Sequence, residues 1–323
     1  MKRIFILGFI FVALSLLSVN AVAQRRGGGN GGANFSTGGS IDVEYTSATL
    51  IGLINKKRIR NLTEYGVVIS KNKDVEDGNY VPADSTKNNR FSVWLGGLEI
   101  GARYYYATYI RHDGFCSYGA VKSFSTKGLT KGEYVDLGLK SRTLWATKNI
   151  GAEKPEEYGL YFQWGDTKGY TSNTDGEKLF DSKHCKYFDA KGLPSKYCEN
   201  DGKTELDFED DAAYVNWGPN WRMPSVEQFR ELFNSPNTKY YGASLNNVSG
   251  YIIISKNGNS IFIPCAGRHL RGGFQDGGWF GYYWSRTASS GAYYANILDT
   301  QGSLHPNSYS ERFNGFSVRP VRR

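Results

Sequence analysis

The sequence has few of the residues that most often carry catalysis or bind metals. Only four His and two Met occur among its 323 residues. The histidines are dispersed, at His112, His184, His269 and His305, so no pair has the spacing of a zinc site. A Gly-x-Ser-x-Gly motif, which would place a nucleophilic serine on a sharp turn, is also absent. The chain lacks an Arg-Gly-Asp tripeptide as well, so integrin-type adhesion has no support.

The carboxylates give no clear acid–base pair and no clear calcium site. Asp207, Glu209, Asp210 and Asp211 could suggest Ca²⁺, which takes six to eight oxygen ligands. A run at the start of a helix cannot direct every carboxylate at one ion, so a solvated helix terminus is the favoured interpretation. We therefore expect no metal and no cofactor, and an enzyme is not the leading hypothesis.

Long hydrophobic runs are missing except at the N-terminus. Two basic residues precede an apolar run over residues 4–17, and Ala21-Val-Ala23 supplies the small residues that a signal peptidase reads. The run is shorter than the ~20 residues that cross a bilayer, which disfavours an uncleaved anchor. We predict a signal peptide over residues 1–23, with cleavage before Gln24. The mature chain should have no transmembrane segment and should reside in the periplasm, on the outer-membrane surface or outside the cell.

The charge is basic without being extreme. Removal of the signal peptide lowers the formal net charge from +8 to +6. Basic residues are mostly interspersed with acidic ones, and the one short cluster is Lys56-Lys-Arg-Ile-Arg60. In an exported protein this pattern argues against a nucleic-acid partner. Contact with acidic glycans stays open.

Cysteine is scarce, with four residues in the chain. Cys185 and Cys198 flank a polar loop, and a disulfide between them would stabilise the fold by about 3 kcal/mol through the entropy of the unfolded chain. We predict this bridge. Cys116 and Cys265 fall in different predicted domains and are interpreted as separate buried thiols.

Composition divides the mature chain into two domains joined by polar segments. Residues 24–39 are Gly-rich and predict a flexible linker, because they bury too little apolar area to offset their backbone entropy. Residues 40–126 predict a β-sandwich, residues 127–132 a hinge and residues 133–323 a second domain. The predicted sandwich strands, rich in β-branched and aromatic residues, cover residues 48–54, 65–70, 91–95, 103–111 and 120–126.

The sandwich contains a recognisable turn. Leu98, Gly101 and Tyr104 have the spacing of the turn into the penultimate strand of a fibronectin type III domain, which the segment resembles. Tyr104 is then the corner tyrosine. Alternation along this strand makes Tyr105 and Tyr109 the candidates for the exposed face.

The second domain has local signals for helices and a hairpin. Ser225 and Gln228 form a capping-box pattern that predicts a helix over residues 225–234. An earlier helix is expected over residues 209–215. Residues 251–255 and 260–263 flank an Asn-Gly turn and predict a hairpin.

Residues 133–323 contain several separate motifs in one order: Tyr134-Val-Asp-Leu-Gly-Leu139, Leu144-Trp-Ala-Thr147, Tyr158-Gly-Leu-Tyr-Phe-Gln-Trp-Gly165, Asp210-Asp-Ala-Ala213, Trp217-Gly-Pro-Asn-Trp-Arg-Met-Pro-Ser-Val-Glu-Gln-Phe-Arg-Glu-Leu232 and Gly315-Phe-Ser-Val-Arg-Pro-Val321. Together these motifs resemble the Fibrobacter succinogenes major paralogous domain. The resemblance implies an α+β C-type-lectin-like fold, related to that of the formylglycine-generating enzymes, on secreted or surface proteins of Gram-negative bacteria. Those enzymes need a reactive cysteine pair late in the domain, and only Cys265 follows Cys198 here.

Between Gly267 and Asn314 the chain mixes aromatic, amide and arginine residues, as binding surfaces do. The leading hypothesis is a non-enzymatic module that holds a glycan or a cell-surface protein there. The alternatives are a structural subunit of an adhesive surface assembly and, third, an enzyme derived from the formylglycine-generating fold. The candidate ligand-binding residues are Trp279, Arg286, Tyr293, Asn296, His305, Asn307, Tyr309 and Arg312.

Overall fold

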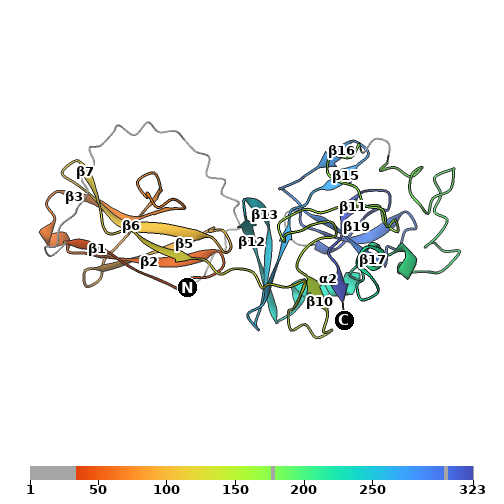
Figure 1. Cartoon of the computed structure of the whole chain (residues 1–323), viewed down its shortest axis with the longest axis horizontal. Coiled ribbons are helices and arrows are strands. Elements are labelled where there is room, and N and C mark those ends of the chain that lie inside the picture. The colour runs from red at the N-terminus through yellow and green to blue at the C-terminus, as the bar shows by residue number, and fades with distance from the viewer. Residues whose placement is uncertain (1–33, 176–178, 302–304, 323) are drawn as a thin grey trace. The chain divides into compact units, whose positions relative to one another are not determined.

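The computed structural model of the chain describes residues 34–175, 179–301 and 305–322, which fall into two units (Figure 1). The first unit takes in the described residues up to Ser40, with Leu50–Val93 and Tyr104–Ser123. The second comprises Ile41–Thr49, Trp94–Arg103 and the described residues from Phe124 onward. The predicted signal peptide lies outside the described ranges. Within those ranges, no helix is long and apolar enough to cross a membrane.

The predicted sandwich consists of two sheets. One has the strand order β1-β2-β5 and the other the order β4-β3-β6-β7, with β8 also paired to β6. This division of strands is that of a fibronectin type III-like sandwich, as the turn at Tyr104 predicted. The strands are β1 (Phe35–Ile41), β2 (Ser47–Ile54), β3 (Leu62–Ser70), β4 (Asn79–Pro82), β5 (Arg90–Gly96), β6 (Arg103–His112), β7 (Phe115–Tyr118) and β8 (Lys122–Ser125), with a short 3-10 helix η1 (Lys56–Arg58).

Strand β1 begins within the predicted linker 24–39 and occupies its last residues. Its Ser-Thr-Gly-Gly composition gives no strand pattern. Hydrogen bonds fix it instead: the Thr108 amide donates to Thr37 Oγ1 at 3.0 Å, and Thr108 Oγ1 donates to the Ser36 carbonyl at 3.1 Å. Partners distant in sequence thus form a strand that local composition does not predict.

The tyrosines of β6 differ in part from the prediction. Tyr104 is buried, and Tyr105 is half-buried. The prediction of an exposed Tyr109 is wrong, because Tyr109 packs in a buried cluster with Val68 and Val75, and its ring centre lies 4.9 Å from that of Tyr80. Its hydroxyl donates to Glu64 Oε1 at 2.7 Å, and burial together with this carboxylate raises its pKa.

The second unit contains several smaller sheets. Their strand orders are β21-β10-β9, β11-β20-β17-β18-β19, β12-β13-β14 and β15-β16. The strands are β9 (Tyr134–Asp136), β10 (Leu144–Ala146), β11 (Tyr161–Phe162), β12 (Thr238–Leu245), β13 (Val248–Ser255), β14 (Ser260–Pro264), β15 (Arg268–Leu270), β16 (Gly273–Gln275), β17 (Tyr282–Ala288), β18 (Tyr294–Asp299), β19 (His305–Glu311), β20 (Phe316–Ser317) and β21 (Val321–Arg322).

The two ends of the predicted second domain meet at Trp145. This residue pairs with Val135 of β9 on one side and with Val321 of β21 on the other. The last strand therefore joins the opening sheet next to β10 rather than directly to β9. The predicted hairpin is confirmed as β13 and β14.

Helix α2 (Val226–Asn234) has the predicted capping box: Gln228 N donates to Ser225 Oγ, and Ser225 N donates to Gln228 Oε1. The earlier helix is shorter than predicted. A 3-10 turn η3 (Phe208–Asp210) precedes α1 (Ala212–Trp217), because Asp211 caps α1 by accepting from the Ala213 and Tyr214 amides. The helix start therefore falls after the acidic run, not within it.

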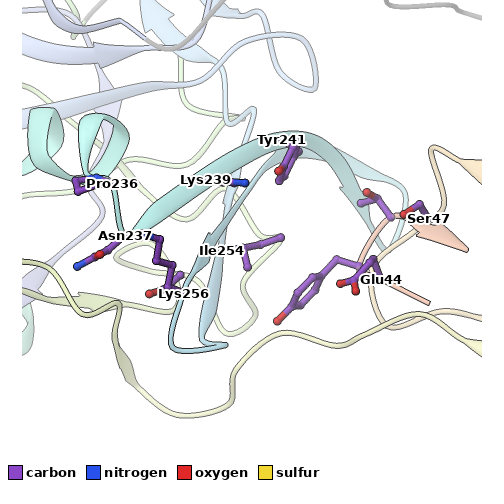
Figure 2. Close-up of a pocket in the computed structure, with 11 residues that line it drawn as sticks. Glu44, Ser47, Pro236, Asn237, Lys239, Tyr241, Ile254 and Lys256 are labelled. Carbon is purple, nitrogen blue, oxygen red and sulfur yellow. The ribbon is translucent and has the colours of Figure 1, made fainter. Parts of the chain in front are cut away.

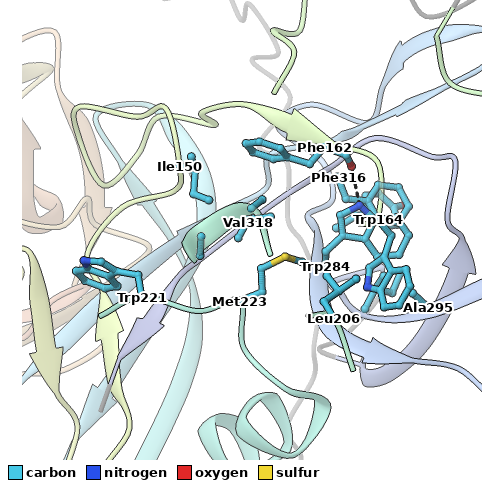
Figure 3. Close-up of a cluster of buried hydrophobic side chains, with 14 of the residues drawn as sticks. Ile150, Phe162, Trp164, Leu206, Trp221, Met223, Trp284, Ala295, Phe316 and Val318 are labelled. Carbon is cyan, nitrogen blue, oxygen red and sulfur yellow. Dashed lines mark hydrogen bonds between the residues drawn. The ribbon is translucent and has the colours of Figure 1, made fainter. Parts of the chain in front are cut away.

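The motifs that carry the family resemblance of the second domain consist mostly of core residues. Trp164, Trp284 and Phe316 pack together (Figure 3). The Trp164 indole donates to the Ser285 carbonyl at 2.8 Å, and the Trp284 indole donates to the Phe162 carbonyl at 2.7 Å. Arg319 is also buried, and its Nε donates to Asn149 Oδ1 at 2.8 Å. Burial lowers the pKa of this guanidinium to about 10. These motifs hold the fold together.

Candidate functional site

Arg312, predicted to face a ligand, is instead buried, with 1% of its surface exposed. Its guanidinium donates to the carbonyls of Lys196 (3.1 Å), Tyr197 (2.7 Å) and Tyr294 (3.2 Å). It also lies 4.5 Å from the centre of the Trp164 ring. Burial lowers its pKa to about 10. The prediction is corrected: Arg312 fastens a loop to the sheet.

Arg286 also has a structural role in place of the predicted contact with a ligand. Its Nε lies 2.9 Å from Glu205 Oε2, and its Nη1 donates to the Met223 carbonyl and to Gln228 Oε1, both at 2.9 Å. The side chain is 18% exposed. Arg286 joins β17 to helix α2.

Asn296 supports a β-bulge. The register between β17 and β18 shifts between Trp284 and Ala288. The Asn296 amide donates to the carbonyls of Ala288 (2.8 Å) and Thr287 (3.4 Å), beside the shift in register. In this structure the side chain supports the backbone at the bulge, and the binding role of Asn296 stays a prediction.

The other candidates reach the surface. Trp279 is 62% exposed, Tyr309 63% and Tyr293 37%, and His305 is exposed too. The side chain of Asn307 lies outside the described residues. Among the predicted set, exposure thus selects the aromatic residues and His305.

These exposed residues lie at different positions along the five-stranded sheet. Tyr282 pairs with Asp299, which pairs with His305, and the Thr300 amide donates to the Gly281 carbonyl at 3.0 Å, so Trp279 and His305 share one end. Tyr309 pairs with Asn296, near the start of β18 and next to Tyr293. Asn296 is three residues, or about 10 Å, from Asp299 along β18, so Tyr309 is about 10 Å from the position of His305, and Tyr293 is farther away. Trp279 and Tyr293 therefore lie toward different ends of the sheet, with Tyr309 between them.

The loop that carries Trp279 is held firmly. The amides of Trp279 and Phe280 both donate to the Asp276 carbonyl at 3.0 Å, and the Gly278 amide donates to the Cys265 carbonyl at 2.8 Å. Asp276 has a φ of 64°, in the left-handed region, which turns the chain sharply after β16. An exposed indole on a fixed loop loses little conformational entropy on binding.

A charged pair stands beside this loop. Arg268 Nε lies 2.8 Å from Asp276 Oδ2, and the guanidinium stacks 4.5 Å from the centre of the Tyr282 ring. The β15-β16 hairpin aligns Arg268 with Gln275, the residue before Asp276. Sequence reasoning missed this pair, although the Gly272-Gly273 turn between the two short strands was a usable signal. We call Trp279, Arg268, Asp276 and His305 the Trp279 face.

A second polar cluster organises the loop that the two predicted bridging cysteines flank. Asp210 has no exposed side-chain surface and accepts from Lys186 Nζ (2.9 Å), Lys196 Nζ (2.6 Å), Tyr197 Oη (2.5 Å) and Tyr187 Oη. Burial alone would raise the pKa of this carboxyl, but the four donors outweigh it and lower the pKa to about 2. The cluster therefore closes the loop.

The predicted Cys185–Cys198 bridge is not formed: all four cysteines are free thiols in this structure. The two residues that follow Cys185 and the two that precede Cys198 all donate hydrogen bonds to the Asp210 carboxylate. These bonds hold the two ends of the loop together, as the predicted disulfide would have done. Cys185 is buried and Cys198 half-buried. Burial raises the pKa of Cys185 to about 12.

Three of the four acidic residues considered for Ca²⁺ come together. Within the described residues, ligand oxygens of Asp207, Glu209 and Asp210 lie within 4.8 Å of one another. Lys196 Nζ already sits among them, 2.7 Å from Asp207 Oδ2 and 2.6 Å from Asp210 Oδ2. Asp211 points elsewhere, with Arg222 Nε at 2.7 Å from its Oδ2. An ammonium occupies the position that a cation would take.

Comparisons with known proteins add little to this geometry. No family model and no curated protein matches the chain. A fibronectin type III domain from human KIAA0970 protein is 15% identical, with 31% of this chain and 77% of that chain covered and a TM-score of 0.23. The sensor domain of the anti-sigma factor RsgI4 in Pseudobacteroides cellulosolvens is 11% identical over 29% and 94%, with a TM-score of 0.25. For the chicken CNTN1 FN1-FN3 domains the values are 10% identity, 89% and 98% coverage and a TM-score of 0.25. The sandwich assignment therefore rests on its own strand order.

Proposed function

We propose that this chain is an exported, non-enzymatic module that binds a glycan at the Trp279 face. The observation that carries the proposal is the 62% exposed indole on a loop fixed by three backbone hydrogen bonds. Aromatic faces stack on sugar rings, and the neighbouring Arg268 and Asp276 offer groups that bond hydroxyls or carboxylates. In this proposal the charged pair takes the place of Arg286 and Arg312, because its two members flank the Trp279 loop and are each more than a quarter exposed.

The wider setting of this proposal comes from the motifs. Residues 133–323 resemble the Fibrobacter succinogenes major paralogous domain, which implies a C-type-lectin-like fold in secreted or surface proteins. Pairing of β10 with both β9 and β21 supports this fold, since it brings the ends of the domain together. We propose that the sandwich acts as a spacer and the second domain as the binding part.

A glycan array tests the proposal. Wild-type protein should bind a restricted set of glycans, with the same intensity when a chelator is present. The Trp279→Ala variant should bind at least about tenfold more weakly, because a buried aromatic anchor contributes ~2 kcal/mol or more and ~1.4 kcal/mol is one decade. Trp94→Ala is the matched control, since Trp94 on β5 is 69% exposed but lies in the sandwich.

Three results would overturn this assignment. One is the absence of any glycan bound, another is equal binding by wild type and Trp279→Ala, and the third is loss of binding on chelation. A Tyr309→Ala variant that alone loses binding would move the site along the sheet to Tyr309. In the alternative, a structural subunit of a surface assembly, the array would stay blank while the protein self-associates or captures a surface protein.

A further inference from the structure

Strand β12 forms an edge of its sheet that differs from an ordinary half-buried strand. It pairs with β13 without a bulge, from Thr238 opposite Ser255 to Leu245 opposite Val248. Four consecutive residues are exposed, Lys239, Tyr240, Tyr241 and Gly242. Natural edges are usually protected by proline, bulges or several charges, because a bare edge pairs with other chains. This stretch has only Lys239 for that purpose.

The direction of the backbone groups along this edge follows from one contact. The Ser244 carbonyl accepts from the Ile100 amide at 3.1 Å, so the peptide groups of Ser244 point away from β13. Backbone groups alternate along a strand, so those of Gly242 and Tyr240 point the same way. The Asn246-Asn247 turn agrees, since both residues have positive φ (48° and 64°), as in a two-residue hairpin closed by Leu245 and Val248. The edge therefore offers donors and acceptors at residues 240 and 242.

A cavity of about 410 Å³ lies in the second unit beside this stretch (Figure 2). Lys239 and Tyr241 line it from β12, Ile254 lines it from β13, and residues 44–47 complete it across from them. Side chains at alternate positions of a strand point to one face, which is why Lys239 and Tyr241 share the cavity. A strand added to β12 would direct alternate side chains toward the same space.

The charges around this cavity favour an acidic ligand. Lys239 and Lys256 both line it. In the described ranges neither lysine has an acidic partner, whereas the nearby Glu44 is paired with Lys127 at 2.7 Å. Two ammonium groups without a counter-charge attract a carboxylate.

We propose that β12 accepts an extended acidic peptide as an additional strand, with a peptide carboxylate held between Lys239 and Lys256. Main-chain hydrogen bonds to Tyr240 and Gly242 give such a strand affinity, and the cavity gives it side-chain selectivity. This surface is separate from the Trp279 face, so the Trp279→Ala variant keeps its peptide binding.

The experiment uses a phage-displayed random peptide library panned against the mature chain, followed by fluorescence anisotropy of synthetic copies of the enriched peptides. Enriched peptides should carry Asp or Glu and should bind Gly242→Pro about tenfold or more weakly than wild type, because proline removes an outward amide and blocks the edge. Gly242→Ala is the matched control. A Cβ there meets no atom within 4 Å, and the amide is kept, so binding should not change. Lys256→Ala should weaken binding several-fold.

A second measurement keeps the proposal testable if the Gly242→Pro variant does not fold. Each peptide is N-methylated at one residue at a time and tested on wild-type protein, and only alternate positions should lose affinity. Equal loss at neighbouring positions, no acidic enrichment, or full binding by a folded Gly242→Pro would overturn the proposal. A wild-type dimer that Gly242→Pro makes monomeric would show that a second copy occupies the edge, which also overturns it.

Discussion

Two loops of the second unit are each organised by an aspartate, but they differ in what they leave exposed to solvent. Around Asp210, two lysines and two tyrosines converge on a carboxylate with no exposed surface. Around Asp276, the backbone carbonyl fixes the turn and leaves Trp279 62% exposed. Both sequences mix aromatic and charged residues. Composition therefore does not distinguish a loop whose aromatic residues surround a buried carboxylate from a loop that leaves an aromatic residue exposed.

The largest expected effect is on the Asp210 loop. Asp210→Ala leaves Lys186 and Lys196 beside an empty site, and removal of one partner from a buried ion pair typically costs about 3 kcal/mol or more. Urea unfolding followed by Trp fluorescence measures the loss. Glu209→Ala is the control, because Glu209 is 72% exposed, and it should change stability by less than ~0.5 kcal/mol. Equal stability of the two variants would remove the distinction between the loops.

Arg312→Met is expected to cost about 2 kcal/mol. The thioether fills much of the space over Trp164, but three backbone carbonyls lose their donor, and a buried acceptor left unpaired costs ~1–3 kcal/mol. Arg268→Met, on the exposed loop, should leave the free energy of unfolding nearly unchanged. A larger loss of stability in Arg268→Met than in Arg312→Met would contradict the structural role of Arg312.

Acid should weaken the Asp210 loop in a defined range of pH. The folded pKa of Asp210 is about 2, below the ordinary value of 3.8. A depressed carboxyl pKa stabilises the fold fully above the unfolded value, and this contribution is lost as pH falls from about 4 to 2. The loss is on the order of 2 kcal/mol. Unfolding curves recorded between pH 5 and 2 should show a steeper decline for wild type than for Asp210→Asn. Parallel declines would contradict the role given to Asp210.

The smallest expected effect is a difference in the alkylation rates of two cysteines. Cys185 is buried with its pKa raised to about 12, so iodoacetamide should modify it much more slowly at pH 8 than it modifies the half-buried Cys198. Non-reducing peptide mapping accompanies the labelling. A peptide that joins Cys185 to Cys198 would support the sequence-based prediction over the free thiols of this structure.

Local patterns predicted much of the fold. The capping box at Ser225, the hairpin after Tyr251 and the turn into Tyr104 each lie within a few residues, so their geometry is set by neighbours. Trp145 and Trp164, which belong to the motifs that carry the family resemblance, are both buried in the core. None of these signals depends on the ligand.

The candidate site was predictable only in part. Trp279 and Tyr309 are exposed, and their role as ligand contacts stays a prediction. The role of Arg312 depends on carbonyls 115 and 116 residues away, and the pairing of Arg268 with Asp276 depends on a hairpin register. Side-chain type shows which residues are able to bind, whereas the fold decides which of them already have partners.

One pair of measurements directly tests the contrast between the Trp279 loop and the Asp210 loop. Stability by urea unfolding and glycan affinity by titration calorimetry are determined for Trp279→Ala and for Asp210→Asn. We expect Trp279→Ala to lose affinity about tenfold with stability within ~0.5 kcal/mol of wild type, and Asp210→Asn to lose stability while its folded fraction binds normally. Loss of affinity in Asp210→Asn with no change in Trp279→Ala would place recognition on the Asp210 loop and contradict the account.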